Sequence, residues 1–318
     1  MTAKAVGSTL VTLGEIMGLL TPVGVGALHH ARDLRLSIAG SESNVAIGVS
    51  RLGGRAVWIG RVGRDEIGEL ILRELRAEGV TVHATDDAAP TGLMLKTRRT
   101  AEVTRVSYYR SGSAGSRLAP EDIDEDCVRA AGVLHVTGIT PALGVAPAAA
   151  VHAAVEIARS AGVPVSLDLN YRAALWDRAT AANVLRDLVK QADVVFAGEH
   201  EAALVVDADT PERAARALAE LGPQQALVKL GARGSVAVIE GTVHHRAALP
   251  VRALDPVGAG DAFAAGYLSE LLAGAPPVQR LTSATAMGAF AVTVAGDWEG
   301  LPRRHELALL DAPDDVVR

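Results

Sequence analysis

Apolar residues along the chain follow two patterns that alternate. Short continuous apolar runs are typical of strands buried in a parallel sheet, and longer segments with apolar residues at helical spacing are typical of amphipathic helices. The runs lie at residues 10–13, 56–59, 133–136, 165–169, 194–196 and 226–230. The segments with helical spacing cover residues 42–52, 65–78, 147–161, 179–191, 211–221, 258–273 and 278–295. This alternation predicts right-handed βαβ crossovers and a mostly parallel sheet with helices on both faces, an α/β fold.

Two segments, residues 15–38 and 91–116, interrupt this alternation. They contain short pieces in which exposed and buried positions alternate, such as Leu93, Leu95 and Thr97 on one side of a strand. We predict that both segments pair into a small second sheet, the lid, that covers the main body. The chain shows no internal repeat, so residues 1–318 are expected to form one domain that carries this lid.

Composition narrows the class of protein. Hydrophobic residues make up 49% and charged residues 21%, which is ordinary for a globular protein. The net charge is −6 and there is no long basic run, which argues against nucleic acid and anionic membranes as partners. Cys127 is the only cysteine, no apolar stretch reaches about 18 residues, and residues 1–8 lack the apolar core of a secretory signal. We therefore expect a cytoplasmic enzyme.

The segment Asp255–Gly266, with the sequence DPVGAGDAFAAG, carries the strongest chemical signal. Gly258 and Gly260 allow the backbone to turn tightly at the start of a predicted helix, where unpaired N–H groups and the helix dipole favour an anion. Asp261 lies in the first turn of that helix and could accept a proton from a hydroxyl group while phosphoryl transfer takes place. A glycine-rich turn followed by an aspartate also occurs in α/β proteins with other functions, and spacing alone does not separate the two interpretations.

This segment resembles the signature near the C-terminus of the ribokinase-like (phosphofructokinase B-type) carbohydrate kinases. A second signature of that family is similar to the stretches 39–46 (AGSESNVA), 52–54 (LGG) and 60–68 (GRVGRDEIG), and the two occur in the expected order. The resemblance extends from Leu10 to about Pro302. It implies a Rossmann-like ribokinase fold with a β-sheet lid, ATP as the phosphoryl donor and Mg²⁺ bridging the phosphates.

The resemblance also implies roles for residues of this chain. Gly258, Ala259 and Gly260 would form the anion hole, and Asp261 would be the catalytic base. Gly40 and Asn44 would contact the sugar. The nucleotide would be bordered by Lys229, Gly231 and Gly234, together with Gly258 and Gly260. Glu201 would act indirectly on the metal, and the loop containing Asp297 would approach the nucleotide or a monovalent cation, with a solvated loop as the alternative.

Three further segments, residues 108–116, 138–143 and 168–172, resemble the branch of the family that converts 2-keto-3-deoxygluconate to its 6-phosphate. By this resemblance Tyr108, Arg110 and Arg172 would line a sugar-acid pocket. The chemistry agrees, because arginine binds a carboxylate in a bidentate manner and a phenol can donate a hydrogen bond to the same ligand. Taken alone, each arginine could equally form a surface salt bridge.

The sequence departs from that branch at three places. Met94 replaces a tyrosine of the lid, Gly198 replaces an asparagine three residues before Glu201, and Ala39 replaces the first glycine of a Gly-Gly pair. Two alternatives therefore stay open: a kinase of a neutral sugar such as fructose, and a non-catalytic sugar sensor. Because a lid sheet has exposed edges, we also expect a homo-oligomer that assembles through the lid.

Overall fold

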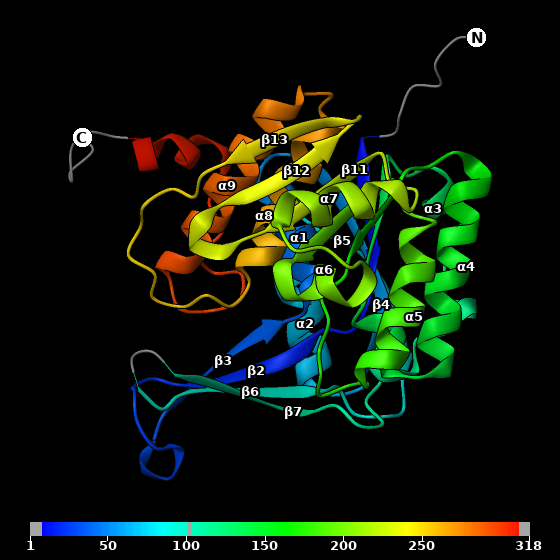
Figure 1. Cartoon of the computed structure of the whole chain (residues 1–318). Coiled ribbons are helices and arrows are strands. Elements are labelled where there is room, and N and C mark those ends of the chain that lie inside the picture. Colours follow the sequence, from blue (N-terminus) through cyan, green and yellow to red (C-terminus); the bar gives the residue numbers. More distant parts are fainter. Residues whose placement is uncertain (1–7, 101–102, 312–318) are drawn as a thin grey trace.

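A nine-stranded sheet forms the centre of the computed structural model, which describes residues 8–100 and 103–311 (Figure 1). Residues 1–7, on which the expectation about a secretory signal rests, and residues 101–102 of the predicted lid lie outside the described residues. The strand order is β13-β12-β11-β10-β9-β8-β1-β4-β5. Their bounds are β1 (Thr9–Leu13), β4 (Arg55–Gly63), β5 (Thr81–Asp87), β8 (Val133–Thr137), β9 (Val165–Asp168), β10 (Val194–Gly198), β11 (Gln225–Lys229), β12 (Ser235–Ile239) and β13 (Thr242–Arg246).

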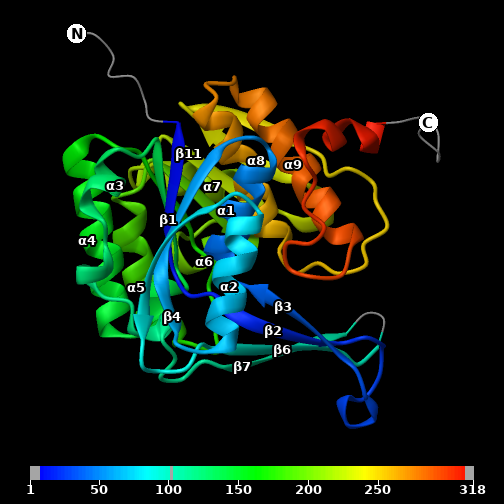
Figure 2. The ribbon, with the colours of Figure 1, turned by 180° about the vertical axis from the view of Figure 1, so that it is seen from behind.

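Six of the eight pairings in this sheet are parallel, and the two antiparallel ones, β11 with β12 and β12 with β13, lie at one edge. Helices pack on both faces and bury two separate apolar clusters (Figure 2). One face carries α3 (Glu125–Arg129), α4 (Val145–Ala161), α5 (Arg178–Val189), α6 (Glu199–Val205) and α7 (Pro211–Glu220). The other carries α1 (Ser41–Arg51), α2 (Glu66–Ala77), α8 (Ala259–Leu272) and α9 (Pro277–Thr293). Successive strand residues alternate between the clusters, so the continuous apolar runs are explained by burial on both faces. The predicted α/β architecture is confirmed.

The second sheet has four strands in the order β3-β2-β6-β7, with bounds β2 (Met17–Pro22), β3 (Leu34–Ala39), β6 (Leu93–Arg98) and β7 (Thr104–Tyr109). It is the predicted lid, and it has its own small apolar cluster around Met17, Leu19, Ala39 and Met94. In Figure 1 it lies below the main body, next to the carboxyl ends of the parallel strands. None of the helices in the described part of the chain is long and apolar enough to cross a membrane.

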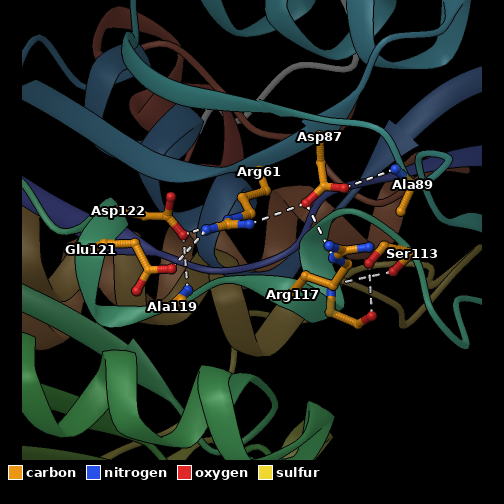
Figure 3. A network of polar contacts seen from close by, with 9 residues as sticks. Arg61, Asp87, Ala89, Ser113, Arg117, Ala119, Glu121 and Asp122 are labelled. Atoms are coloured by element: carbon orange, nitrogen blue, oxygen red, sulfur yellow. Dashed lines mark hydrogen bonds and ion pairs between the residues drawn. The ribbon is translucent and has the colours of Figure 1, made fainter.

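A polar network holds the base of the second lid segment (Figure 3). Arg61 of β4 donates hydrogen bonds to Asp87 (3.1 Å) at the end of β5 and to Asp122 (2.6 Å) beyond the lid. Asp87 also accepts a hydrogen bond from the backbone N–H of Ala89 (2.8 Å) and pairs with Arg117 (3.3 Å). The chain enters and leaves the lid through these residues, so the network fixes both ends of the segment against the main sheet.

Candidate active site

The candidate site lies at the carboxyl ends of the central strands. There β1 pairs with β4 on one side and β8 on the other, and the chain leaves β1 to enter the lid. This is the point at which the strand order reverses, where open parallel sheets bind their ligands. The loops that follow β1, β8 and β9 and the first turns of α1 and α8 therefore converge beneath the lid.

Asp261 is the centre of a buried hydrogen-bond network. Its two carboxylate oxygens accept hydrogen bonds from Ser41 Oγ (2.7 Å) and Asn44 Nδ2 (2.8 Å), and Asn170 Nδ2 in turn donates to Ser41 Oγ (2.6 Å). Burial raises the pKa of Asp261 to about 7, although the hydrogen bonds from Ser41 and Asn44 oppose this change. A carboxyl group with a pKa near neutrality can accept a proton during a reaction and release it afterwards.

The turn before α8 has the backbone geometry of an anion site. Gly258 adopts a left-handed conformation with φ of 80°, and a Cβ atom there would overlap the carbonyl oxygen of Asp297. Helix geometry leaves the N–H groups of Gly260 and Asp261 without partners inside the helix. The ammonium group of Lys229 lies beside these N–H groups, as shown by its distance of 3.2 Å from the position that a Cβ atom on Gly260 would take. Lys229 Nζ also pairs with Asp168 Oδ2 at 2.6 Å.

One pocket brings the predicted sugar-contacting residues together beneath the lid. The pocket is lined by all six of them, Gly40, Asn44, Tyr108, Arg110, Arg172 and Asp261, and also by Gly258 of the predicted anion hole. Gly40 allows the close approach of two segments, since a Cβ there would be 2.7 Å from the carbonyl oxygen of Glu15. Met94, the residue that replaces a tyrosine, also lines the pocket and is buried.

The two arginines of the pocket differ in their surroundings. Arg110 is buried and forms an ion pair with Glu15, with distances of 2.7 Å from Nε and 2.5 Å from Nη2 to Glu15 Oε2. Ser113 donates a further hydrogen bond to the other oxygen of Glu15. Arg172 is exposed at the rim, where Nη1 donates to the backbone oxygen of Tyr171 (3.3 Å). The positive charge of Arg110 is therefore largely balanced, whereas Arg172, which also lines the pocket, is exposed to solvent.

The sequence analysis did not identify two carboxylates of the pocket. Glu15 lies two residues after the end of β1, beyond Gly14, and Glu42 lies inside the stretch 39–46 that resembles the family signature. Glu42 Oε1 accepts hydrogen bonds from the hydroxyls of Thr137 (2.7 Å) and Thr140 (2.8 Å), while burial raises its pKa above the ordinary value. An acidic residue close to the carboxyl end of a buried strand was the available signal for Glu15.

The remaining predicted residues lie next to the pocket rather than in its wall. Gly231 and Gly234 form the turn after β11, with φ of 58° and 97°, two and five residues beyond Lys229. Glu201 caps α6, with Oε2 accepting from the N–H of Gly198 (2.6 Å) and Oε1 from the N–H of Tyr171 (3.1 Å). Its indirect role at a metal stays a prediction.

Among the described residues, no group of three or more acidic, histidine or cysteine side chains could hold a metal ion by itself. Mg²⁺ at a phosphoryl-transfer site is commonly held by one or two carboxylates together with substrate phosphates. Asp168 Oδ1 is a buried oxygen without a hydrogen-bond partner, and it lies on the carboxylate that pairs with Lys229. Asp168 is therefore the side chain that best fits such a shared ion.

A buried carboxyl group beside a helix N-terminus, a lysine at the same turn and a pocket beneath a lid are typical of an enzyme that transfers a phosphoryl group to a small molecule. Residues 8–304 match the family model of the pfkB family carbohydrate kinases. The chain belongs to this family of carbohydrate kinases.

Relatives of known name cover almost the whole chain. It is 38% identical to the 2-dehydro-3-deoxygluconokinase of Bacillus subtilis (strain 168), over 94% of each protein. It is 34% identical to the 2-dehydro-3-deoxygalactonokinase of Haloferax volcanii, over 97% of this chain and 95% of that one. A fructokinase of Escherichia coli is 37% identical over a shorter part, 84% of this chain and 90% of its own length.

Solved structures agree on the fold. The PfkB protein from Polaromonas sp. JS666 matches with a TM-score of 0.86 at 36% identity, over 94% of this chain and 98% of that one. A putative ribokinase II from E. coli, in complex with ATP and Mg²⁺, matches with a TM-score of 0.88 at 26% identity, over 96% and 99%. The ribokinase-like fold expected from the sequence is thereby confirmed.

Proposed function

We propose that this chain transfers the γ-phosphoryl group of ATP to a hydroxyl of a 2-keto-3-deoxy sugar acid, and that 2-keto-3-deoxygluconate is its substrate. The observation that carries the proposal is Arg172, a cation at the opening of the pocket whose base is Asp261. A sugar acid bound with its hydroxyl at Asp261 would have its carboxylate within reach of a guanidinium group, which binds carboxylates with fixed geometry. The 2-dehydro-3-deoxygluconokinase and the 2-dehydro-3-deoxygalactonokinase among the relatives support the same class of substrate.

The residues of the site would divide the reaction among them. Asp261 accepts the proton of the sugar hydroxyl. The hydroxyl oxygen then forms a bond to the γ-phosphorus of ATP, while the bond from this phosphorus to the β,γ-bridging oxygen breaks and ADP leaves. The N–H groups of Gly260 and Asp261 and the ammonium of Lys229 stabilise the charge on the transferred group. Gly231 and Gly234 would border the nucleotide. Mg²⁺, when bound, would supply further positive charge at the phosphates, with Asp168 as its carboxylate and Glu201 acting indirectly.

A neutral sugar is the alternative substrate, and the pairing of Arg110 with Glu15 favours it. This pair offers a balanced set of donors and acceptors that suits hydroxyl groups as well as a carboxylate. The fructokinase among the relatives is consistent with this alternative.

ADP release, measured with ATP, Mg²⁺ and a panel of sugars, tests the proposal. The panel contains 2-keto-3-deoxygluconate, its galactonate epimer, gluconate, fructose and ribose. Activity should be confined to the 2-keto-3-deoxy acids. In Arg172→Ala, the KM for the acid should rise about 10- to 100-fold, because one or two hydrogen bonds to a charged group are lost. Any activity on fructose should change less than about threefold.

Arg178→Ala is the matched control, since Arg178 is exposed on α5 and bonds to the backbone of Ala203 away from the pocket. It should leave every KM unchanged. Strong turnover of fructose or ribose, with no effect of Arg172→Ala on the acids, would overturn the substrate assignment while leaving the family unchanged.

We also propose that the lid pairs with the lid of a second copy. Its edge strands expose apolar side chains, with Leu34 and Leu36 of β3 at 45% and 47% exposure and Tyr109 of β7 at 64%. Exposed apolar edge strands favour association. Light scattering of the purified protein should give the mass of at least a dimer, and a monomer would contradict this.

A cytoplasmic location stays a proposal, supported by the single cysteine. So does a monovalent cation near Asp297, whose side chain is buried rather than solvated.

A further inference from the structure

Lys96 of the lid is buried to an extent that is unusual for a lysine. Its exposed fraction is 1%, and its side chain lies on the inner face of β6, two positions from Met94. Burial of an ammonium group is unfavourable unless carboxylates surround it. Lys96 Nζ lies 2.7 Å from Asp297 Oδ1 and 3.0 Å from Asp255 Oδ2. Burial lowers the pKa of Lys96, but the two carboxylates more than compensate and raise it above its ordinary value, so the group stays charged.

Both carboxylates belong to the backbone framework of the anion hole. Asp255 accepts hydrogen bonds from the N–H of Val257 (3.2 Å), just before the turn, and from the N–H of Gly296 (3.3 Å). The carbonyl oxygen of Asp297 fills the space beside Gly258 that a side chain would need. The ammonium of Lys96 therefore joins the two segments that together set the position of Gly258.

The loop that contains Asp297 also contacts the lid at a second place. Trp298 Nε1 donates a hydrogen bond to the backbone oxygen of Ile38 in β3 (3.1 Å), and Ser37 Oγ donates to Glu299 Oε1 (2.6 Å). The lid strands that line the sugar pocket are thus fastened to the same loop that supports the anion hole. A shift of the lid would move Lys96 away from Asp255 and Asp297 and leave two buried carboxylates next to the turn.

We propose that Lys96 is a positioning residue for phosphoryl transfer, whose ammonium group joins Asp255 and Asp297 so that the anion-hole turn takes its active geometry only when the lid is seated. The inference rests on the proposed role of the Gly258–Asp261 turn. It does not depend on which sugar is the substrate.

The test uses two variants of the full chain, Lys96→Met/Asp297→Asn and Lys96→Ala. Lys96→Met alone leaves two buried carboxylates and could prevent folding. The double variant Lys96→Met/Asp297→Asn keeps the formal charge of the group unchanged, since one cation and one anion are removed together. It should fold, with a smaller loss of stability than Lys96→Met, because only Asp255 is left without its cation and still accepts hydrogen bonds from the N–H groups of Val257 and Gly296. Its kcat should fall about 10- to 100-fold with each KM within about threefold, because the loss concerns groups that act in the transition state.

Lys96→Ala leaves a space lined by two carboxylates, which a small cation can enter. Ammonium or methylammonium should raise its kcat at least about tenfold in a saturable way, and tetramethylammonium at equal ionic strength should not. A merely structural role of Lys96 would give neither this selective rescue nor a loss confined to kcat.

Calorimetry with ADP, Mg²⁺ and aluminium fluoride, a mimic of the transferring phosphoryl group, gives a readout without any sugar. The double variant should bind this mixture at least about tenfold more weakly than the wild type while binding ADP alone equally well. Equal binding of the mimic, or wild-type kcat in the folded double variant, would overturn the proposal. A wild-type chain that is inactive on the whole sugar panel would count against the proposed function only, since the mimic still tests Lys96.

Discussion

Replacing Asp261 by asparagine should lower kcat by about 10²- to 10⁴-fold with little change in the KM for the sugar. Asparagine has nearly the same size, so the pocket keeps its shape, but its amide cannot accept the proton of the hydroxyl. Steady-state ADP release measures both constants. Asp207→Asn, which removes an exposed carboxylate outside the pocket, is the control and should have no effect. Nearly unchanged turnover in Asp261→Asn would mean that another group is the base.

The pH profile provides an independent readout of the same group. Burial raises the pKa of Asp261 to about 7, and the base must be ionised to act, so kcat/KM should fall as the pH is lowered below about 7. Ser41→Ala removes a hydrogen bond that lowers this pKa, so the midpoint should move to higher pH by up to about one unit. Titration of ATP would not shift in this variant. An unmoved midpoint would show that the profile reports a group other than Asp261.

Arg110→Met should lower the free energy of unfolding by about 3–5 kcal/mol, because it leaves the carboxylate of Glu15 buried without its cation. The side chain of Glu15 has an exposed fraction of 0% and that of Arg110 10%, so water cannot replace the missing partner. Urea unfolding, followed by circular dichroism, measures the change. An effect below about 1 kcal/mol would show that water or another group reaches Glu15.

Two comparisons separate this effect from loss of substrate binding. The double variant Arg110→Met/Glu15→Gln removes both charges and should recover most of the lost stability. Arg172→Ala, at an exposed position of the same pocket, should change stability by less than about 0.5 kcal/mol. The structure thus changes how Arg110 is interpreted: it lines the predicted pocket, but its guanidinium group already has a carboxylate partner within the protein.

The sequence predicts most of the main sheet because its central strands are buried on both faces and read as continuous apolar runs. It gives no strand for β5 or for the hairpin of β12 and β13, which lie at the two edges of the sheet. The sequence of β5, TVHATDD, is largely polar, as suits an edge strand. The hairpin has no helix between its strands, so it falls outside the βαβ pattern that the apolar runs and helical segments predict.

Asp261 and its turn could be found from the sequence because they lie within seven consecutive residues, 255–261. Among their partners, Asn44 and Lys229 were implied by the family resemblance, whereas Ser41 and Lys96 were not, since only the fold brings them to the site. Ser41 is 220 positions from Asp261, and Lys96 is 201 positions from Asp297. A serine in a helix and a lysine in a strand with alternating polarity are ordinary residues in sequence, and neither pattern indicates a buried hydrogen bond or ion pair.

The lid enters the fold as two insertions, one after β1 and one after β5, and each returns to the main body before the next element begins. The part of the sugar pocket that Tyr108 and Arg110 form can therefore change with the second module, without any change in the core. A chimera that receives both modules from a relative should take over only part of the donor's sugar preference, because Arg172 follows β9 in the core. Because Lys96 belongs to the second module and its two carboxylates to the core, such a graft should be productive only where the incoming strand brings a matching cation.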